Sequence, residues 1–176
     1  MTDAPRSLVE RIADLRRYSN AWLQPQISEA FAILEALELE VARAVAKGIT
    51  LVFSAGNGHV SFPSMHPDVI SAGGVFVDKD MSLRASDYAS AFEARPYPGR
   101  HVPDVCGLVG MQPHAIYIML PLQPGCDIDT QLASGGDFPE GDETGTADGW
   151  SVISGTSAAA PQLAGVCALL LQKNPK

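Results

Sequence analysis

The residues with the clearest potential for chemistry lie near the carboxyl terminus, in the segment Ser154-Gly155-Thr156-Ser157-Ala158-Ala159-Ala160-Pro161. Small side chains surround Ser157 at the predicted start of an apolar helix. The first N–H groups of a helix have no partner inside it, and the helix dipole is positive there, so negative charge that develops nearby is stabilised. Pro161 is tolerated this early in a helix, and it cannot donate a hydrogen bond back to the carbonyl of Ser157. Ser157 is therefore a candidate nucleophile; the alternative is that Thr156 or Ser157 only caps the helix.

The elements that would position this serine alternate between helix and strand. A helix is predicted over residues 27–47, where apolar side chains keep helical spacing up to Gly48. The apolar, β-branched run at residues 49–53 follows directly and predicts a strand buried on both faces. Because a helix that leads straight into such a strand is typical of a parallel α/β unit, we predict an α/β fold.

Further elements are expected along the rest of the chain. They are an amphipathic helix at residues 7–18, strands at 69–77 and 115–122, an irregular segment at 84–113, and a helix from Thr156 through Leu171. That last helix is apolar nearly all round, so we expect it to lie in the middle of a larger fold. Residues 134–149 are rich in glycine and acidic side chains and predict a solvated loop.

Length, charge and cysteine content exclude several classes of protein. A chain of 176 residues suits one domain, and its formal net charge of −8 argues against binding to nucleic acid. No apolar run is long enough for a membrane span, and the first residues lack the apolar centre of a signal peptide. The three cysteines have no CxxC spacing, so neither a disulfide framework nor a zinc ribbon is expected. The sequence does not assign a compartment.

Two motifs together resemble a known family. The segment Gly155–Pro161, followed by Gln162–Val166, resembles the serine motif of the subtilisin-like serine peptidases, the subtilases. Ser54-Ala55-Gly56-Asn57, after a predicted strand, resembles the second landmark of that family, and residues 63–74 are similar to the stretch that follows it. The resemblance covers residues 19–174, with both landmarks in the family's order.

The resemblance implies peptide-bond hydrolysis by a doubly wound parallel sheet with helices on both faces. Ser157 would attack the scissile carbonyl and form an acyl-enzyme that water then clears. The Asn57 amide would help form the oxyanion hole together with the backbone N–H of Ser157 and the Thr156 hydroxyl. The remaining landmark residues would line the pocket for the residue before the cut: Ser54, Ala55 and Gly56.

The chain departs from the family where the general base is expected. Family members carry Asp and then His upstream of the asparagine landmark, in Asp-Ser-Gly or Asp-Thr-Gly and His-Gly-Thr contexts. Only 53 residues precede Ser54-Ala55-Gly56-Asn57 here, and they contain no histidine. Of the histidines present, His59 follows Asn57 most closely, whereas His66 and His114 are expected to be solvated loop residues. We therefore expect residues 1–176 to form a single, incomplete peptidase domain that is inactive alone, with Asp and His supplied by an upstream segment or a second chain.

Several alternatives stay open. A non-catalytic subtilase-like module could use the same cleft to bind a peptide or a partner protein. The sedolisin branch is disfavoured because it normally carries an acidic residue where this chain has Asn57. No cofactor is expected; the five carboxylates of residues 134–149 are suited to Ca²⁺ in type, yet their spacing matches no known calcium loop, so a solvated acidic surface is favoured. Nucleotide binding is rejected because Gly56-Asn57-Gly58 lacks the remaining glycine and a suitably placed acidic residue.

Overall fold

A computed structural model describes residues 24–111, 118–133 and 144–175. The helix predicted at residues 7–18 lies outside this part of the chain, as do residues 134–143 of the predicted acidic loop. The described elements, in chain order, are α2 (Gln24–Ala46), β1 (Val52–Ser54), β2 (Ile70–Val77), β3 (Leu83–Ala85), β4 (Phe92–Glu93), β5 (His101–Val102), β6 (Val105–Leu108), β7 (Ile118–Pro121), α3 (Asp127–Leu132), β8 (Trp150–Ile153) and α4 (Thr156–Lys173).

The helix α2 and the strand β1, which lead to the landmark Ser54-Ala55-Gly56-Asn57, form where the sequence predicts a helix and a strand. α2 ends at Ala46, and the chain leaves it through Gly48, whose φ of +77° is a conformation that glycine adopts without strain. The Gly48 N–H donates to the carbonyl of Val45 at 2.8 Å, and the Ile49 N–H donates to the carbonyl of Ala44 at 3.1 Å. These two bonds satisfy carbonyls at the end of α2 and turn the chain directly into β1.

The long strand β2 is the centre of a mixed sheet. It pairs in parallel with β1, with Val52 opposite Ile70 and Ser54 opposite Ala72, and in parallel with β6. β3 adds to the far end of β2 in the antiparallel direction. The sheet with its helices confirms the predicted α/β class.

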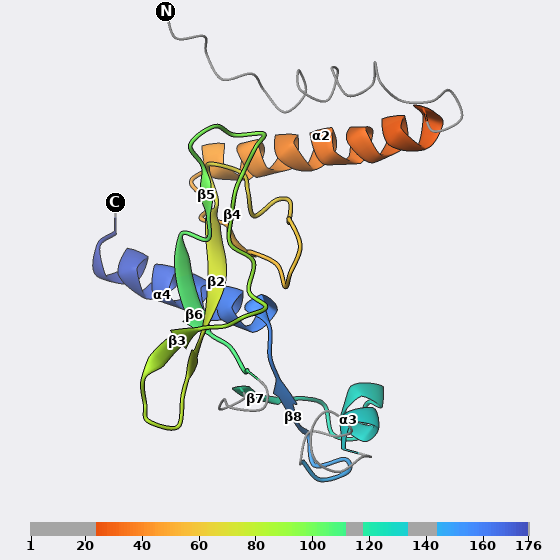
Figure 1. The fold of residues 1–176 in the computed structure, drawn as a ribbon, viewed down its shortest axis with the longest axis vertical. Coiled ribbons are helices and arrows are strands. Elements are labelled where there is room, and N and C mark those ends of the chain that lie inside the picture. Colours follow the sequence, from red (N-terminus) through yellow and green to blue (C-terminus); the bar gives the residue numbers. More distant parts are fainter. Residues whose placement is uncertain (1–23, 112–117, 134–143, 176) are drawn as a thin grey trace, which may run out of the picture.

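α4 covers one face of this sheet and packs on β1, β2 and β6. The core between them consists of Ala72, Val109 and Ala159, which are almost fully buried. The backbones come close because Gly107 has no side chain: a Cβ built there would lie 3.0 Å from the Cα of Ala159. Figure 1 places the sheet and α4 in the middle of the molecule, with α2 at one end and β7, β8 and α3 at the other.

Residues 84–113 correct the sequence-based expectation. This segment was predicted to be irregular because of its prolines, yet it contains β4, β5 and β6 and the end of β3. These strands are two to four residues long, so neither alternation nor an apolar run marks them in the sequence. Pro96, Pro98 and Pro103 lie in the loops between them, whereas Pro113 lies outside the described residues. β8 was not predicted either; it pairs with β7 through Leu120 and Ser151.

The degree of burial of β1 and α4 also differs from expectation. β1 is half-buried, because β2 is its only neighbouring strand in the described part of the sheet. The second half of α4 exposes large apolar side chains, including Leu169 at 66% and Leu170 at 57%. β1 and α4 therefore have the apolar composition of buried elements but are partly exposed in this structure.

Among the described residues, no helix combines the length and the apolar character that a membrane span requires.

Two glycine-to-alanine substitutions should have opposite effects on stability. Gly107→Ala should destabilise the fold by about 1–3 kcal/mol, because its Cβ would press on α4 at Ala159. Gly165→Ala should stabilise it by about 0.5–1 kcal/mol, because position 165 is inside α4 and a Cβ there meets nothing within 4 Å. Urea unfolding of both variants checks this pair. Equal effects of the two substitutions would contradict the packing described for β6 and α4.

Candidate functional site

The landmark Ser54-Ala55-Gly56-Asn57 forms a tight turn at the end of β1. Ala55 is fully buried, and its N–H donates to the carbonyl of Ala72 on β2 at 2.8 Å. Gly56 follows with a φ of +109°. A Cβ at Gly56 would lie 2.8 Å from the carbonyl oxygen of His59, so the turn requires glycine for both its backbone angles and its space.

Ser90 holds this turn in place. Its hydroxyl oxygen accepts hydrogen bonds from the N–H groups of Gly58 and His59, both at 3.1 Å, and donates to the carbonyl of His59 at 2.7 Å. Its own N–H donates to the carbonyl of Gly56 at 2.9 Å. The role of Ser90 cannot be predicted from the sequence, because nothing in the local pattern indicates that a serine 31 or more residues away meets the turn.

Asn57 and Thr156 join the two landmarks. The backbone N–H of Thr156 donates to Asn57 Oδ1 at 3.0 Å, and the Thr156 hydroxyl donates to the same oxygen at 2.9 Å. The Thr156 hydroxyl oxygen in turn accepts a hydrogen bond from the N–H of Gly56 at 3.2 Å. Because a backbone N–H can only donate, the atom facing it must be the amide oxygen of Asn57. The amide nitrogen Nδ2 therefore lies on the other side of the group.

Ser157 lies in the first turn of α4, directly after this hydrogen-bonded pair. Its side chain is exposed, and it has no hydrogen-bond partner among the described residues. Its N–H is one of the first N–H groups of α4, which have no partner within the helix. The residue before the helix is Gly155, with a φ of +128°, and no side chain caps the helix. The capping role considered for Thr156 and Ser157 is thus wrong: the Thr156 hydroxyl binds Asn57 instead.

Gly155 keeps the Asn57 amide accessible. A Cβ at position 155 would lie 3.3 Å from Asn57 Nδ2, closer than most side-chain contacts. Glycine at this position therefore leaves space next to the nitrogen that carries the two N–H donors. Asn57 itself is exposed.

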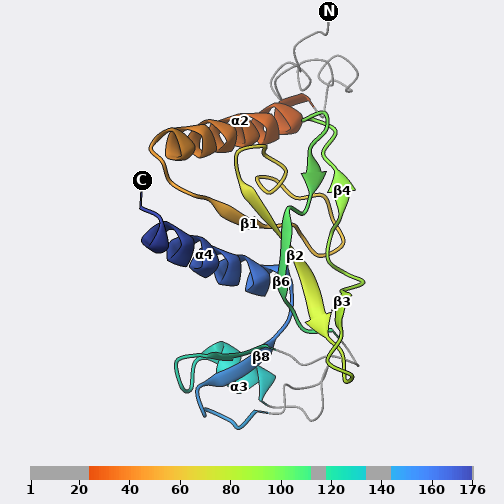
Figure 2. The same cartoon turned by 90° about the vertical axis from the view of Figure 1, so that its left-hand side faces the viewer.

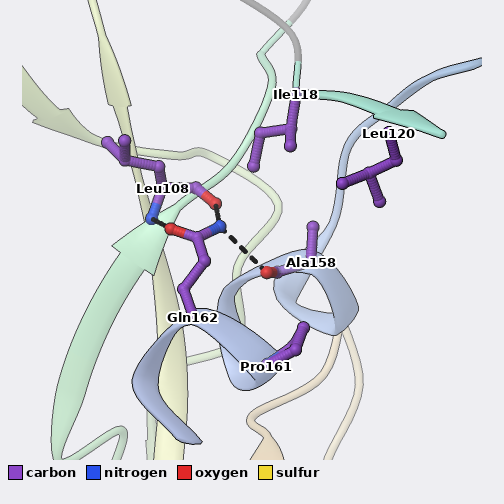
Figure 3. Close-up of a pocket in the computed structure, with 6 residues that line it drawn as sticks. All are labelled: Leu108, Ile118, Leu120, Ala158, Pro161 and Gln162. Atoms are coloured by element: carbon purple, nitrogen blue, oxygen red, sulfur yellow. Dashed lines mark hydrogen bonds between the residues drawn. The ribbon is translucent and has the colours of Figure 1, made fainter. Parts of the chain in front are cut away.

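An apolar pocket of about 380 Å³ lies behind the first turn of α4 (Figure 3). Its lining residues are Leu108, Ile118, Leu120, Ala158, Pro161 and Gln162. The Gln162 side chain fixes one wall: it accepts from the Leu108 N–H at 3.1 Å and donates to the Leu108 carbonyl at 2.8 Å. It also donates to the carbonyl of Ala158 at 2.9 Å. Gln162 thus satisfies both backbone groups of Leu108 at the outer edge of β6 and ties β6 to the turn that carries Ser157.

No described histidine side chain forms a hydrogen bond with Ser157. His66 was expected to be solvated, but it is buried: Nδ1 accepts from the Asp68 N–H at 3.1 Å, and the ring packs edge-on against Tyr97. Burial lowers the pKa of His66 below its ordinary value of 6.5. His59 remains next to the glycine turn at Ser90, and His101 is exposed on β5. His114 lies outside the described residues.

The described acidic groups do not form a metal site. Asp148 accepts hydrogen bonds from the backbone N–H groups of Gly145 and Trp150, and Asp129 accepts one from Gly125 at 2.7 Å. Within the described ranges no three His, Cys, Asp or Glu side chains are grouped so as to hold a metal ion. Four of the five carboxylates of the predicted acidic loop lie outside those ranges: Asp137, Glu140, Asp142 and Glu143.

Thr156→Val should destabilise the chain by about 1–3 kcal/mol, because it leaves the buried Gly56 N–H without an acceptor and removes a donor to Asn57. Thr50→Val is the matched control, since Thr50 is exposed and the same atoms change. That control should stay within about 0.5 kcal/mol of the parent chain. The measurement is the urea midpoint of each variant. Similar midpoints for the two variants would show that the pair of hydrogen bonds does not hold the landmarks together.

Comparisons with known proteins identify the family and a similar fold. The chain is similar to the crystal structure of a lanthipeptide protease, with a TM-score of 0.56 and 21% sequence identity over 85% of this chain and 45% of that chain. The chain thus spans less than half the length of that protease. A comparison with curated proteins gives no match. The family model described as the subtilase family matches residues 15–176. This chain therefore belongs to the subtilase family.

Proposed function

We propose that this chain is the nucleophile-bearing part of a serine endopeptidase whose complete domain is a doubly wound parallel sheet with helices on both faces. The observation that carries the proposal is the hydrogen-bonded pair of Asn57 and Thr156, beside an exposed Ser157 at the start of α4. Membership of the subtilase family supports hydrolysis of a peptide bond. The substrate is a peptide or a protein, and the net charge of −8 argues against nucleic acid.

In the proposed reaction, Ser157 Oγ forms a bond to the scissile carbonyl carbon, and its proton passes to a base. The carbonyl oxygen becomes negative and is stabilised by Asn57 Nδ2 and by the backbone N–H of Ser157. Collapse of this intermediate releases the amine, which takes a proton, and leaves an acyl-enzyme on Ser157. A water molecule then releases the acid and restores the serine. These steps need no metal and no other cofactor.

Thr156 acts in this scheme as a positioning residue. Its hydroxyl already donates a hydrogen bond to Asn57 Oδ1. It therefore orients the amide and does not donate to the oxyanion. By holding Oδ1 it turns Nδ2 toward the space that Gly155 leaves open. Ser54, Ala55 and Gly56 do not line the apolar pocket beside α4. In the proposed enzyme, the backbone of their turn would meet the residue before the cut.

The base must come from outside the described residues. No described histidine side chain is hydrogen-bonded to Ser157: His66 accepts a hydrogen bond from the Asp68 N–H instead, and the Ser157 hydroxyl has no partner among the residues that the structure describes. We infer that Asp and His are supplied by an upstream segment or by a second chain, and that residues 1–176 alone form an incomplete, inactive peptidase domain.

A second candidate is a non-catalytic module that binds a peptide or a partner protein in the same cleft. It is favoured by the same observation, a serine without a base among the described residues. It differs in one measurable respect: a peptide would bind to the chain and never be cleaved, whichever partner is present.

Labelling with a fluorophosphonate probe separates the two functions, because such probes react appreciably only with an activated serine. We expect mass spectrometry to find the adduct on Ser157 in lysate of the source cells and not on the purified chain. Ser157→Ala should abolish the label, whereas Ser154→Ala, at an exposed serine just before α4, should retain it. Labelling of the pure chain would overturn the inferred outside base, and His59 would be replaced next. No label in either sample would favour the non-catalytic module.

A further inference from the structure

The backbone of His59 is held in one position beside the turn at Gly56. The Ser90 hydroxyl accepts a hydrogen bond from the His59 N–H at 3.1 Å and donates one to the His59 carbonyl at 2.7 Å. Asn57, two residues earlier, forms an isolated antiparallel bridge with Ala89. Both backbone groups of His59 are thus bound, and its side chain leaves the loop from a point that is fixed relative to Gly56 and Asn57.

The His59 imidazole folds back onto Gly56. A Cβ built at Gly56 would lie 3.3 Å from His59 Nε2, so this ring nitrogen lies against the buried glycine, although His59 as a residue is exposed. Among the described residues, no group forms a hydrogen bond with either ring nitrogen of His59. In every protonation state of an imidazole, at least one ring nitrogen carries a hydrogen and can donate. The imidazole is therefore a hydrogen-bond donor beside Gly56 that a ligand can reach.

No other described side chain with a comparable contact lies at this turn. Of the described histidines, His66 is buried against Tyr97, and His101 lies on β5. The apolar pocket beside α4 has one polar side chain in its lining, Gln162, which is bound to backbone groups of β6 and α4. That pocket can select a ligand by size, whereas the imidazole of His59 can select one by its hydrogen-bonding groups.

We propose that His59 determines the specificity for the residue before the cut and selects a side chain with an oxygen acceptor, such as a glutamate carboxylate or a glutamine carbonyl. This inference rests on the proposed function, in which the turn of Ser54, Ala55 and Gly56 meets that residue. A side chain that lies against this turn reaches the imidazole at Gly56, and its oxygen accepts the imidazole N–H. An aliphatic side chain of the same length would displace water from the imidazole and leave the donor without a partner, so it binds less well.

Peptide phosphonate esters test this inference, because they react with an activated serine and carry a side chain at the position before the cut. Three esters that differ only in that side chain, which is glutamate, glutamine or norleucine, are added to lysate of the source cells, and mass spectrometry follows the adduct on Ser157. We expect the glutamate and glutamine esters to react at least about tenfold faster than the norleucine ester. His59→Ala should bring the three rates to within about twofold of one another. His101→Ala, at an exposed histidine on β5, should keep the preference of the parent chain.

His59→Glu is an independent test, because a carboxylate accepts hydrogen bonds where the imidazole donates them. In this variant a lysine ester should react faster than the glutamate ester. Equal rates of the three esters with the parent chain, or an unchanged preference in His59→Ala, would reject His59 as the residue that sets specificity. Loss of the fluorophosphonate label from His59→Ala would show that His59 activates the serine, and it would also overturn the inference. Absence of that label from the parent chain in lysate would instead reject the proposed function, and the inference with it.

Discussion

The site depends on the hydrogen bonds between Asn57 and Thr156, residues 99 positions apart in the chain. One amide oxygen accepts both the backbone N–H and the hydroxyl of Thr156, and that hydroxyl accepts the N–H of Gly56. The end of β1 and the start of α4 are thereby fixed to each other. The bonds also decide which side of the amide faces the open space beside Gly155, and so where an oxyanion would find its donors. In the proposed peptidase, the serine and the donors for its oxyanion would thus be organised without the base.

The sheet provides the frame for this contact. α4 can approach β6 closely because Gly107 faces Ala159, and Gln162 ties the end of β6 to the first turn of α4. Those contacts lie on the first half of α4, whereas its second half and the free edge of β1 have no such partners in the described structure. An organised serine with no described base is what we expect of a catalytic part whose base comes from an upstream segment or a second chain.

Much of this arrangement could be predicted from the sequence, because its signals are local. Gly48 marks the end of α2, the apolar run before Ser54 marks β1, and the small residues around Ser157 mark the start of α4. The rest depends on contacts between distant residues. Ser90 meets the glycine turn only in the folded chain, and β6 is four residues long and has no pattern of its own. The partial exposure of β1 could not be predicted either, because an apolar run indicates that a strand prefers burial but not which neighbours are present.

The most direct test of the account is a double-mutant cycle on Asn57→Ala and Thr156→Val, with the free energy of unfolding measured in urea for the parent, both single variants and the double variant. If one amide oxygen holds the two landmarks together, the two substitutions share that loss, and the coupling energy should reach at least about 1 kcal/mol. Effects that add to within about 0.3 kcal/mol would show that the two side chains act independently. That result would contradict the proposed basis of the site.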